Sequence, residues 1–212
     1  MSDWTDLGRP SKLRERRRFS GLTRTTDATV EPVTRQEMKD FLKLDVNDED
    51  PLVTSLITAA RLACENYCKR SFATQTWVLT LDDQVEDYDI VVLPRPNLLS
   101  VTSVKYYDSS DVQQTLATTF YNLDTNGNLG RIVFTSSIPD TSTTRKPSWE
   151  ITYTAGFGAA ATDIPEDIKL AIKLTVADYY QYRGTQVSST IRSTIPNHIE
   201  AMLDPHKIMM IA

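Results

Sequence analysis

Apolar residues recur at helical spacing in three segments of this 212-residue chain. The first segment opens with Thr34 and Glu37, a spacing typical of a capping box, in which the Thr hydroxyl and the Glu carboxylate each accept a backbone N–H at the start of a helix. Met38 and Phe41 follow at positions that share one helical face. The pattern therefore predicts a short helix over residues 34–44.

A second helix is predicted over residues 51–70. Asp50 is suited to the N-cap, and Pro51 is suited to the first helical position because its backbone angle already matches a helix. The residues that we expect on the buried face of this helix are Val53, Leu56, Ile57, Ala60, Cys64, Tyr67 and Cys68.

A third helix is predicted over residues 165–183, with a cap at or beside Asp163. One apolar face consists of Ile168, Ala171, Ile172, Thr175, Val176 and Tyr179. A second apolar strip is formed by Leu170, Leu174 and Ala177. Because such a wide apolar surface needs cover on more than one side, the strip is expected either to pack inside the chain or to form a subunit interface.

Between the second and third helices, over residues 74–154, the apolar pattern changes to a period of two, which indicates strands. Turn-forming residues such as Asn126 and Gly127 separate the strand-like stretches. No helical pattern lies between these stretches, so parallel crossovers are not expected and the sheet should be antiparallel. The predicted fold class is α+β: a small bundle of about three main helices with an inserted antiparallel β-sheet, and extended N- and C-terminal arms.

The two ends of the chain lack these patterns. Residues 1–30 contain too few apolar side chains to form a core, and they predict a flexible arm. Residues 31–184 form the folded domain. The tail, residues 185–212, begins with a polar stretch and then regains apolar residues, which we expect to dock on partner subunits: Ile199, Met202, Leu203, Ile208, Met209 and Ile211.

The formal net charge of −5 hides an uneven distribution of 23 basic and 28 acidic residues. Residues 1–26 hold seven basic and three acidic side chains, a net charge of +4, which leaves −9 for the remainder. The basic arm contains Arg14, Arg16, Arg17 and Arg18, which could neutralise phosphates. A solvated tail and an arm that contacts an acidic protein surface are the alternative interpretations.

Composition excludes several classes of protein. No apolar stretch approaches the roughly 18 residues that span a bilayer, and no apolar region follows the N-terminal charges as in a secretory signal. Two cysteines are too few for a disulfide scaffold. We therefore expect a soluble intracellular protein without a membrane partner.

Two motifs are similar to a dinucleotide-binding turn and to a pair of metal ligands, but the surrounding sequence supports neither site. Residues 156–161 fit the glycine pattern of a dinucleotide-binding turn, but no parallel βαβ unit is predicted around them. Cys64 and Cys68 could face one metal ion, but the only two histidines, His198 and His206, lie far away in the tail. Packing in the core is the favoured interpretation of both cysteines. No catalytic, cofactor or metal site is predicted, and the chain is not expected to be an enzyme.

In the order of its elements, the chain resembles the head–tail connector (adaptor) proteins of tailed bacteriophages. The resemblance covers about residues 32–184 and rests on three stretches: Pro32–Arg61 with Cys64–Tyr67 and Arg70–Phe72, Ile151–Gly158 with Ile164–Lys169, and Ala171–Arg183. The basic arm lies outside this pattern. Residues 31–184 would then be a connector domain.

The resemblance implies a structural role. Such a protein would form a homo-oligomeric ring, expected to be a dodecamer, below the portal in the virion neck, after assembly in the host cytoplasm. The ring would join the portal protein to a tail, stopper or tail-terminator protein and let double-stranded DNA pass without sequence recognition during genome ejection. The alternative function is a DNA-associated packaging or regulatory protein that acts through its basic arm.

Overall fold

The computed structural model describes residues 19–82, 84–127, 129–135, 137–142, 144–182 and 195–208 of the chain. These residues form two compact units, a helical unit and a sheet unit. The helical unit combines residues 26–75, 95–99 and 155 onward, and the sheet unit combines residues up to 25 with 76–94 and 100–154. No helix in the described part of the chain is both long and apolar enough to cross a membrane.

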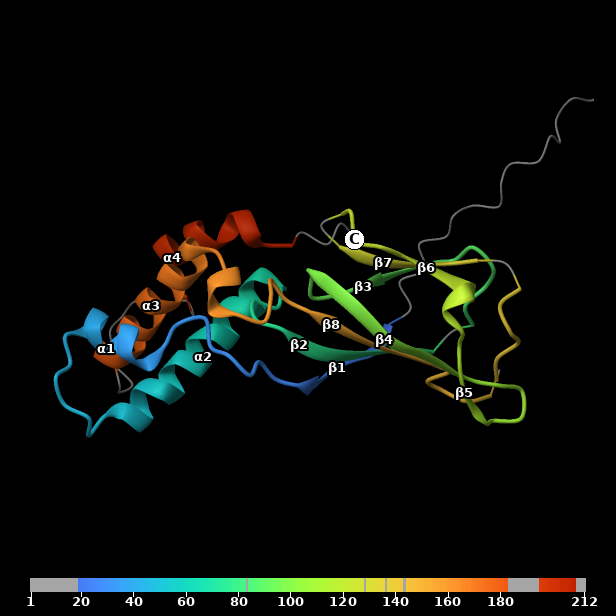
Figure 1. The fold of residues 1–212 in the computed structure, drawn as a ribbon, viewed down its shortest axis with the longest axis horizontal. Helices are drawn as coiled ribbons and strands as arrows, with labels where there is room; N and C mark the ends of the chain where they lie inside the picture. Colours follow the sequence, from blue (N-terminus) through green and yellow to red (C-terminus); the bar gives the residue numbers. More distant parts are fainter. Residues whose placement is uncertain are drawn as a thin grey trace, which may run out of the picture. The chain divides into compact units, whose positions relative to one another are not determined.

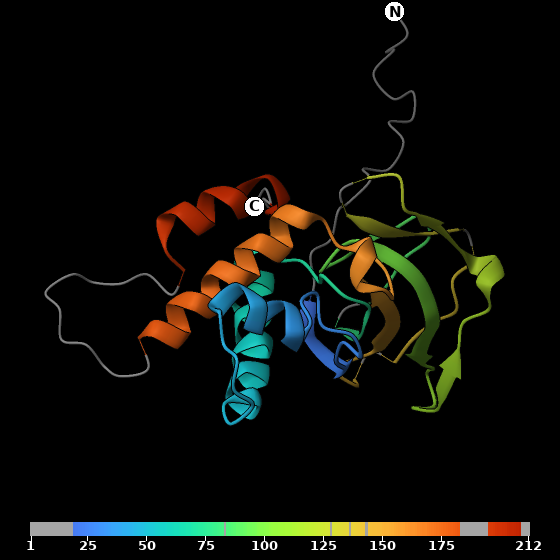
Figure 2. The same cartoon turned by 60° about the vertical axis from the view of Figure 1, so that its left-hand side comes forward.

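The helical unit contains four α-helices (Figures 1 and 2). They are α1 (Arg35–Leu42), α2 (Asp50–Cys68), α3 (Glu166–Gln181) and α4 (Asn197–Leu203). Two short 3-10 turns, η2 (Ala161–Asp163) and η3 (Asp204–His206), precede α3 and follow α4. Helix α3 packs against both α2 and α4, and the apolar core lies among these helices.

The start of α1 confirms the predicted capping box. The Glu37 backbone N–H donates to the Thr34 hydroxyl at 3.2 Å, and the Thr34 N–H donates to the Glu37 carboxylate at 2.7 Å. At the other end, Lys43 adopts the left-handed conformation that closes a helix. Met38 is fully buried as predicted, whereas Phe41 is largely exposed.

The predicted caps of α2 and α3 are wrong by a few residues. Glu49 is the N-cap residue of α2, while Asp50 instead accepts a 2.9 Å bond from the Lys39 ammonium group of α1. Pro165 precedes α3, and Asp163 accepts from the Ala160 N–H at 2.9 Å in the preceding turn. Asp50 and Asp163 thus hold neighbouring segments in place rather than their own helix.

The sheet unit contains two sheets. The five-stranded sheet has the order β1-β2-β8-β4-β5, and the three-stranded sheet has the order β3-β7-β6. The strands are β1 (Phe19–Thr26), β2 (Gln75–Leu81), β3 (Ile90–Leu93), β4 (Leu98–Tyr107), β5 (Gln113–Thr115), β6 (Tyr121–Asp124), β7 (Gly130–Phe134) and β8 (Trp149–Ala155), with a 3-10 turn η1 at Thr118–Phe120.

Alternating burial explains how the two sheets share a core. Strands β2, β7 and β8 each place every second residue in the interior. The Phe134 ring of β7 meets the Trp149 ring of β8 edge to face, with centroids 5.7 Å apart. The pairs β3–β7, β6–β7 and β4–β5 are antiparallel. The predicted α+β class with an inserted antiparallel sheet is confirmed.

The prediction of a flexible arm over residues 1–30 is wrong for its last part. Residues 19–26 form β1, an edge strand paired with β2. The Thr25 hydroxyl donates to the Thr76 carbonyl at 3.3 Å. An edge strand exposes one side and needs few apolar residues, which is why the weak apolar content of this segment concealed it.

Candidate functional site

The candidate interface strip on α3 lies on the outward side of this helix. Leu170 is 42% exposed, and Leu174 and Ala177 are partly buried. The opposite side of the helix is buried in the core and carries Ile168, Ala171, Ile172, Thr175 and Val176. Leu174 also packs against the edge of the chain's own core, so Leu170 is the exposed member of the strip. The role of Leu170, Leu174 and Ala177 at a subunit interface stays a prediction.

A shallow apolar groove of about 230 Å³ lies elsewhere in the helical unit. The segment before α1 forms one wall, and α2 forms the other. Val30 at its edge is 38% exposed, whereas Val33 and Ile57 at its base are buried. The lining residues are Val30, Glu31, Val33, Thr34, Arg35, Thr54 and Ile57. Sequence analysis missed this groove because its two walls are more than 15 residues apart in the chain.

A buried arginine on α2 holds the segment that forms this groove. The side chain of Arg61 is 1% exposed and contacts the carboxylates of Glu31 at 2.8 Å, Asp27 at 3.2 Å and Glu65 at 3.2 Å. Burial lowers the pKa of Arg61, but the Glu31 hydrogen bond and the three carboxylates outweigh it and raise that pKa overall. Since the Thr58 hydroxyl also donates to Glu31 at 2.8 Å, residue 31 is fixed on α2.

The C-terminal tail packs on its own chain. Ile199, Leu203 and Ile208 are buried, and the first two belong to the core of the helical unit. The Ile208 N–H donates to the Cys68 carbonyl at 2.9 Å. Burial of these three side chains is thus accounted for by their own chain, which the predicted docking role did not anticipate.

Two further contacts fix the tail on the helical unit. The Tyr67 hydroxyl donates to Asp204 at 2.6 Å, a bond that raises the pKa of Tyr67 to about 12. His206 contacts Asp167 at the start of α3 at 2.6 Å. Of the other docking candidates, Met202 is partly buried, and Met209 and Ile211 lie outside the described residues. Docking of the tail on a partner stays a prediction.

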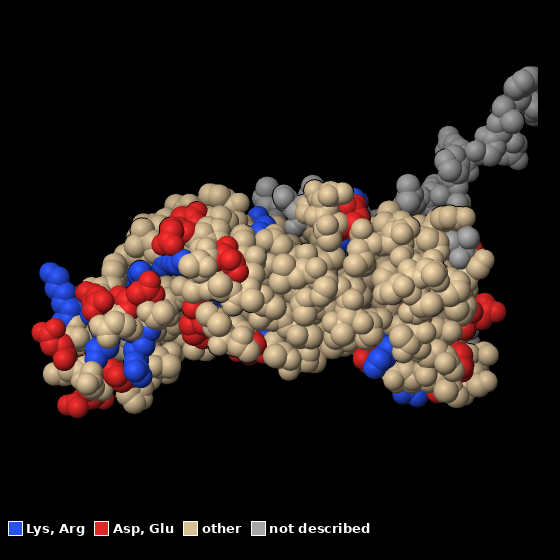
Figure 3. Space-filling view, viewed as in Figure 1, with Lys and Arg blue, Asp and Glu red and all other residues tan. Residues whose placement is uncertain are grey.

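The structure does not describe the predicted basic cluster. Arg14, Arg16, Arg17 and Arg18 lie outside the described residues, directly before β1. On the face shown in Figure 3, basic and acidic side chains are interspersed over the helices, and much of the surface over the strands carries no charge. This face therefore offers no large basic patch for a phosphate backbone.

The two cysteines are buried core residues, as expected. Cys64 and Cys68 are free thiols with no exposed surface. Burial raises the pKa of Cys64 to about 11 and that of Cys68 to about 12, so neither thiol is poised as a nucleophile. The described residues include no group of three or more His, Cys, Asp or Glu side chains that could hold a metal ion.

The glycines of residues 156–161 serve a structural purpose. The chain at this point runs against residues 72–74, with Phe157 N–H donating to the Phe72 carbonyl at 2.8 Å and Thr74 N–H donating to the Gly158 carbonyl at 3.1 Å. A Cβ on Gly156 would lie 2.6 Å from the Ala73 carbonyl oxygen. The motif therefore allows two backbones to approach closely, and the rejected nucleotide interpretation is not needed to explain it.

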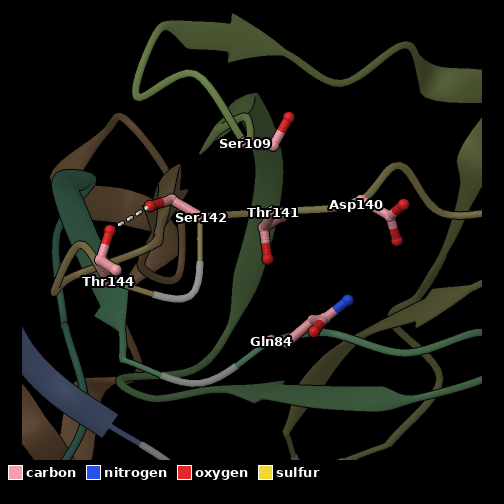
Figure 4. Close-up of a pocket in the computed structure, with 6 residues that line it drawn as sticks. All are labelled: Gln84, Ser109, Asp140, Thr141, Ser142 and Thr144. Atoms are coloured by element: carbon pink, nitrogen blue, oxygen red, sulfur yellow. Dashed lines mark hydrogen bonds between the residues drawn. The ribbon is translucent and has the colours of Figure 1, made fainter.

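A polar pocket of about 350 Å³ lies among the loops of the sheet unit (Figure 4). The Thr141 hydroxyl is buried without a hydrogen-bond partner among the described residues, and Ser142 and Thr144 contact each other at 3.3 Å. The lining residues are Gln84, Ser109, Asp140, Thr141, Ser142 and Thr144. Among these described residues, no hydrogen bond joins the Asp140 carboxylate to a hydroxyl that it could activate.

These features describe a structural assembly protein: an accessible apolar strip, a separate apolar groove, and buried polar groups that hold segments together. A model of the head completion protein family matches residues 31–209, and the chain belongs to this family. Its function is accordingly that of a structural head–tail connector of a phage-type particle.

Solved structures with the same fold come from particle necks. A chain in the neck of an empty GTA particle, computed with C6 symmetry, has a TM-score of 0.73 and 22% identity, covering 91% of this chain and 97% of that chain. A chain in the virion of a native gene transfer agent (GTA) particle has a TM-score of 0.73 and 23% identity, covering 90% of this chain and 97% of that chain. A chain in the neck of the native GTA particle, computed with C12 symmetry, has a TM-score of 0.71 and 22% identity, covering 91% of this chain and 97% of that chain. No curated relative matches by sequence.

Proposed function

We propose that twelve copies of the chain form a closed ring in the neck of a tailed particle, between the portal protein and a tail, stopper or tail-terminator protein. The observation that carries this proposal is the family match over residues 31–209. The likeness to chains from necks computed with C6 and C12 symmetry supports a cyclic arrangement. Assembly in the host cytoplasm, before particles are released, belongs to the same proposal.

Passage of DNA through the ring is compatible with the charge of the folded part. Residues 27–212 carry a net charge of −9. A strongly basic channel would hold the phosphate backbone through counterion release and slow its movement. The acidic body leaves passing DNA unattached, and the basic arm of residues 1–18 is then available for contacts with an acidic protein surface.

Electron microscopy of the purified chain, alone and mixed with its portal protein, tests the proposal. We expect rings in one or both samples, with twelve copies by mass photometry. A chain that stays monomeric in both samples would contradict the proposed ring.

Mobility of duplex DNA over a salt series tests the role of the arm. We expect weak binding at physiological salt, with or without residues 1–18. Tight binding that falls steeply with salt and disappears with the arm would instead support the packaging or regulatory alternative.

A further inference from the structure

We propose that neighbouring copies in the ring join through the α3 strip of one copy and the apolar groove of the next. The strip consists of Leu170, Leu174 and Ala177, and Leu170 would occupy the groove edged by Val30. The inference rests on the proposed ring and goes further by naming the two surfaces that close it.

The strip has the geometry of a docking ridge. Leu170, Leu174 and Ala177 are spaced four and three residues apart, so their side chains line up along the outward side of α3. Leu170 is the most exposed apolar side chain of this helix that the structure describes. Contact with a groove would remove its remaining exposed apolar surface from water, and a ring repeats that burial at every contact.

The groove is apolar and is already formed in the single chain, as a docking site for the strip would need to be. Its walls are mainly apolar, and its base is formed by the buried side chains of Val33 and Ile57. The ion pairs of Arg61 hold Glu31 on α2, so the groove exists before a partner arrives. A preformed site avoids the entropy cost of ordering a loop on binding.

The charges beside the two surfaces are complementary. On α3, Glu166 lies one turn before Leu170 and Lys173 lies one turn after it, about 10 Å apart along the axis at 1.5 Å per residue. The groove carries Glu31 and Arg35, four residues apart and at most about 14 Å from each other. An arrangement with Glu166 near Arg35 and Lys173 near Glu31 pairs opposite charges on both sides of Leu170.

Existing ion pairs at these positions are not an obstacle. Glu166 contacts Lys169 at 2.7 Å, and Arg35 contacts Asp50 at 3.4 Å, with both Glu166 and Arg35 well exposed. Their partners are mostly buried, since the side chain of Lys169 is 11% and that of Asp50 19% exposed. Glu166 and Arg35 can therefore keep these pairs, while their exposed charges select the orientation of the neighbour.

A second copy is the occupant that the symmetry requires. A cyclic ring is built from heterologous contacts, in which each subunit offers two different surfaces. The strip and the groove share no residue, and both belong to the helical unit.

Three substitutions test the contact by ring formation. Leu170→Asp and Val30→Asp should each weaken self-association at least tenfold in mass photometry and remove rings from micrographs. The matched control is Val46→Asp, because Val46 is 56% exposed in the same unit and belongs to neither surface. Circular dichroism and thermal unfolding check that each variant keeps its fold. Normal rings of the Leu170→Asp variant would overturn the inference.

Disulfide trapping tests the contact directly. A Val30→Cys chain mixed with a Leu170→Cys chain should give a cross-linked heterodimer under mild oxidation, and neither chain alone should cross-link. The native thiols of Cys64 and Cys68 are buried and stay out of the reaction. The control mixture combines the Val46→Cys and Leu170→Cys chains, and equal cross-linking there would overturn the inference.

The outcomes separate this inference from the proposed function. Wild-type rings that tolerate Leu170→Asp, or that give no cross-link between positions 30 and 170, leave the ring standing and reject this contact. Loss of rings on deleting residues 1–18, without that cross-link, would mean that the arm occupies the groove and would also reject it. A wild-type chain that forms no ring, even on the portal, rejects the proposed function itself.

Discussion

Arg61 shows how one residue links distant parts of the chain. Its guanidinium group accommodates three carboxylates, from the segment before α1 and from α2 itself. Glu65 connects α2 to the segment that follows it, because its carboxylate also accepts hydrogen bonds from the Phe72 N–H at 2.9 Å and the Gln75 side chain at 2.7 Å. The planar fork of Arg suits such multiple contacts better than the single ammonium group of Lys.

Replacing Arg61 by Met should lower the free energy of unfolding by about 3 kcal/mol. Removing one partner of a buried ion pair costs about 3–5 kcal/mol, and the lower value is expected because Asp27 and Glu31 are partly exposed and can be hydrated. Urea unfolding of both proteins measures the difference. The control is Arg131→Met, because Arg131 pairs with Asp124 at the surface and should lose less than 1 kcal/mol. Equal losses would contradict the account.

At the scale of single elements, α1 depends on its first turn. The helix has eight residues, too few to be stable in isolation. Its capping box satisfies backbone N–H groups that would otherwise lack partners at the helix start. The hydrogen bond from the Thr34 backbone N–H lowers the pKa of Glu37 most, followed by the bond from the Thr34 hydroxyl.

Substituting Thr34 by Ala should cost about 1 kcal/mol of stability at pH 7. Because the pKa of Glu37 is lowered from 4.5 in the folded chain, its contribution is fully present above pH 4.5 and is lost as the pH falls through the lower folded value. Because the Thr34 hydroxyl is the second cause of this lowered pKa, the stability difference between wild type and Thr34→Ala should shrink as the pH falls below 4.5. Urea unfolding at pH 7, 5 and 3.5 measures it. A difference that stays constant with pH would contradict a contribution of the Thr34 hydroxyl to the lowered pKa of Glu37.

Gly156 allows the chain after β8 to approach the backbone of residues 72–74. Its φ of +149° is one that residues with a side chain rarely adopt, and a Cβ there would clash with the backbone of Ala73. Gly156→Ala should reduce stability by about 2 kcal/mol or more. Gly127→Ala is the matched control, because the nearest atom to its Cβ is 3.6 Å away, and its thermal midpoint should hardly change. Thermal unfolding compares the two variants.

At the scale of the whole molecule, the sequence predicts what periodic patterns can encode. The helices over residues 34–44, 51–70 and 165–183 and the inserted sheet follow from amphipathic spacing, and their ends differ from the structure by one or two residues. Strand β1 was missed because an edge strand needs little apolar content. The groove and the Arg61 cluster were missed because they depend on contacts between segments about 20 to 35 residues apart.

The tail shows the limit of apolar content as a signal for partners. The sequence predicts docking on another subunit for Ile199, Leu203 and Ile208, but the structure buries them in their own helical unit. Apolar residues at these positions are compatible with either outcome. A sequence records that an apolar face must be covered, but not whether the cover comes from the same chain. For these three residues the cover comes from the same chain. Residues 209–212 lie outside the described residues, and their docking stays a prediction.

Two truncations distinguish the tail's role in the fold from its predicted role in docking. Deletion of residues 196–212 removes α4 and exposes the core that Ile199 and Leu203 cover, so the chain should lose several kcal/mol of stability, since truncating one buried Leu to Ala already costs about 2–5 kcal/mol. Deletion of residues 209–212 leaves every core residue in place and should keep the wild-type thermal midpoint. Pull-down on the portal protein, with the short deletion against wild type, then tests docking alone. Reduced binding with an unchanged midpoint assigns docking to residues 209–212, which include Met209 and Ile211, and unchanged binding contradicts a docking role for the end of the tail.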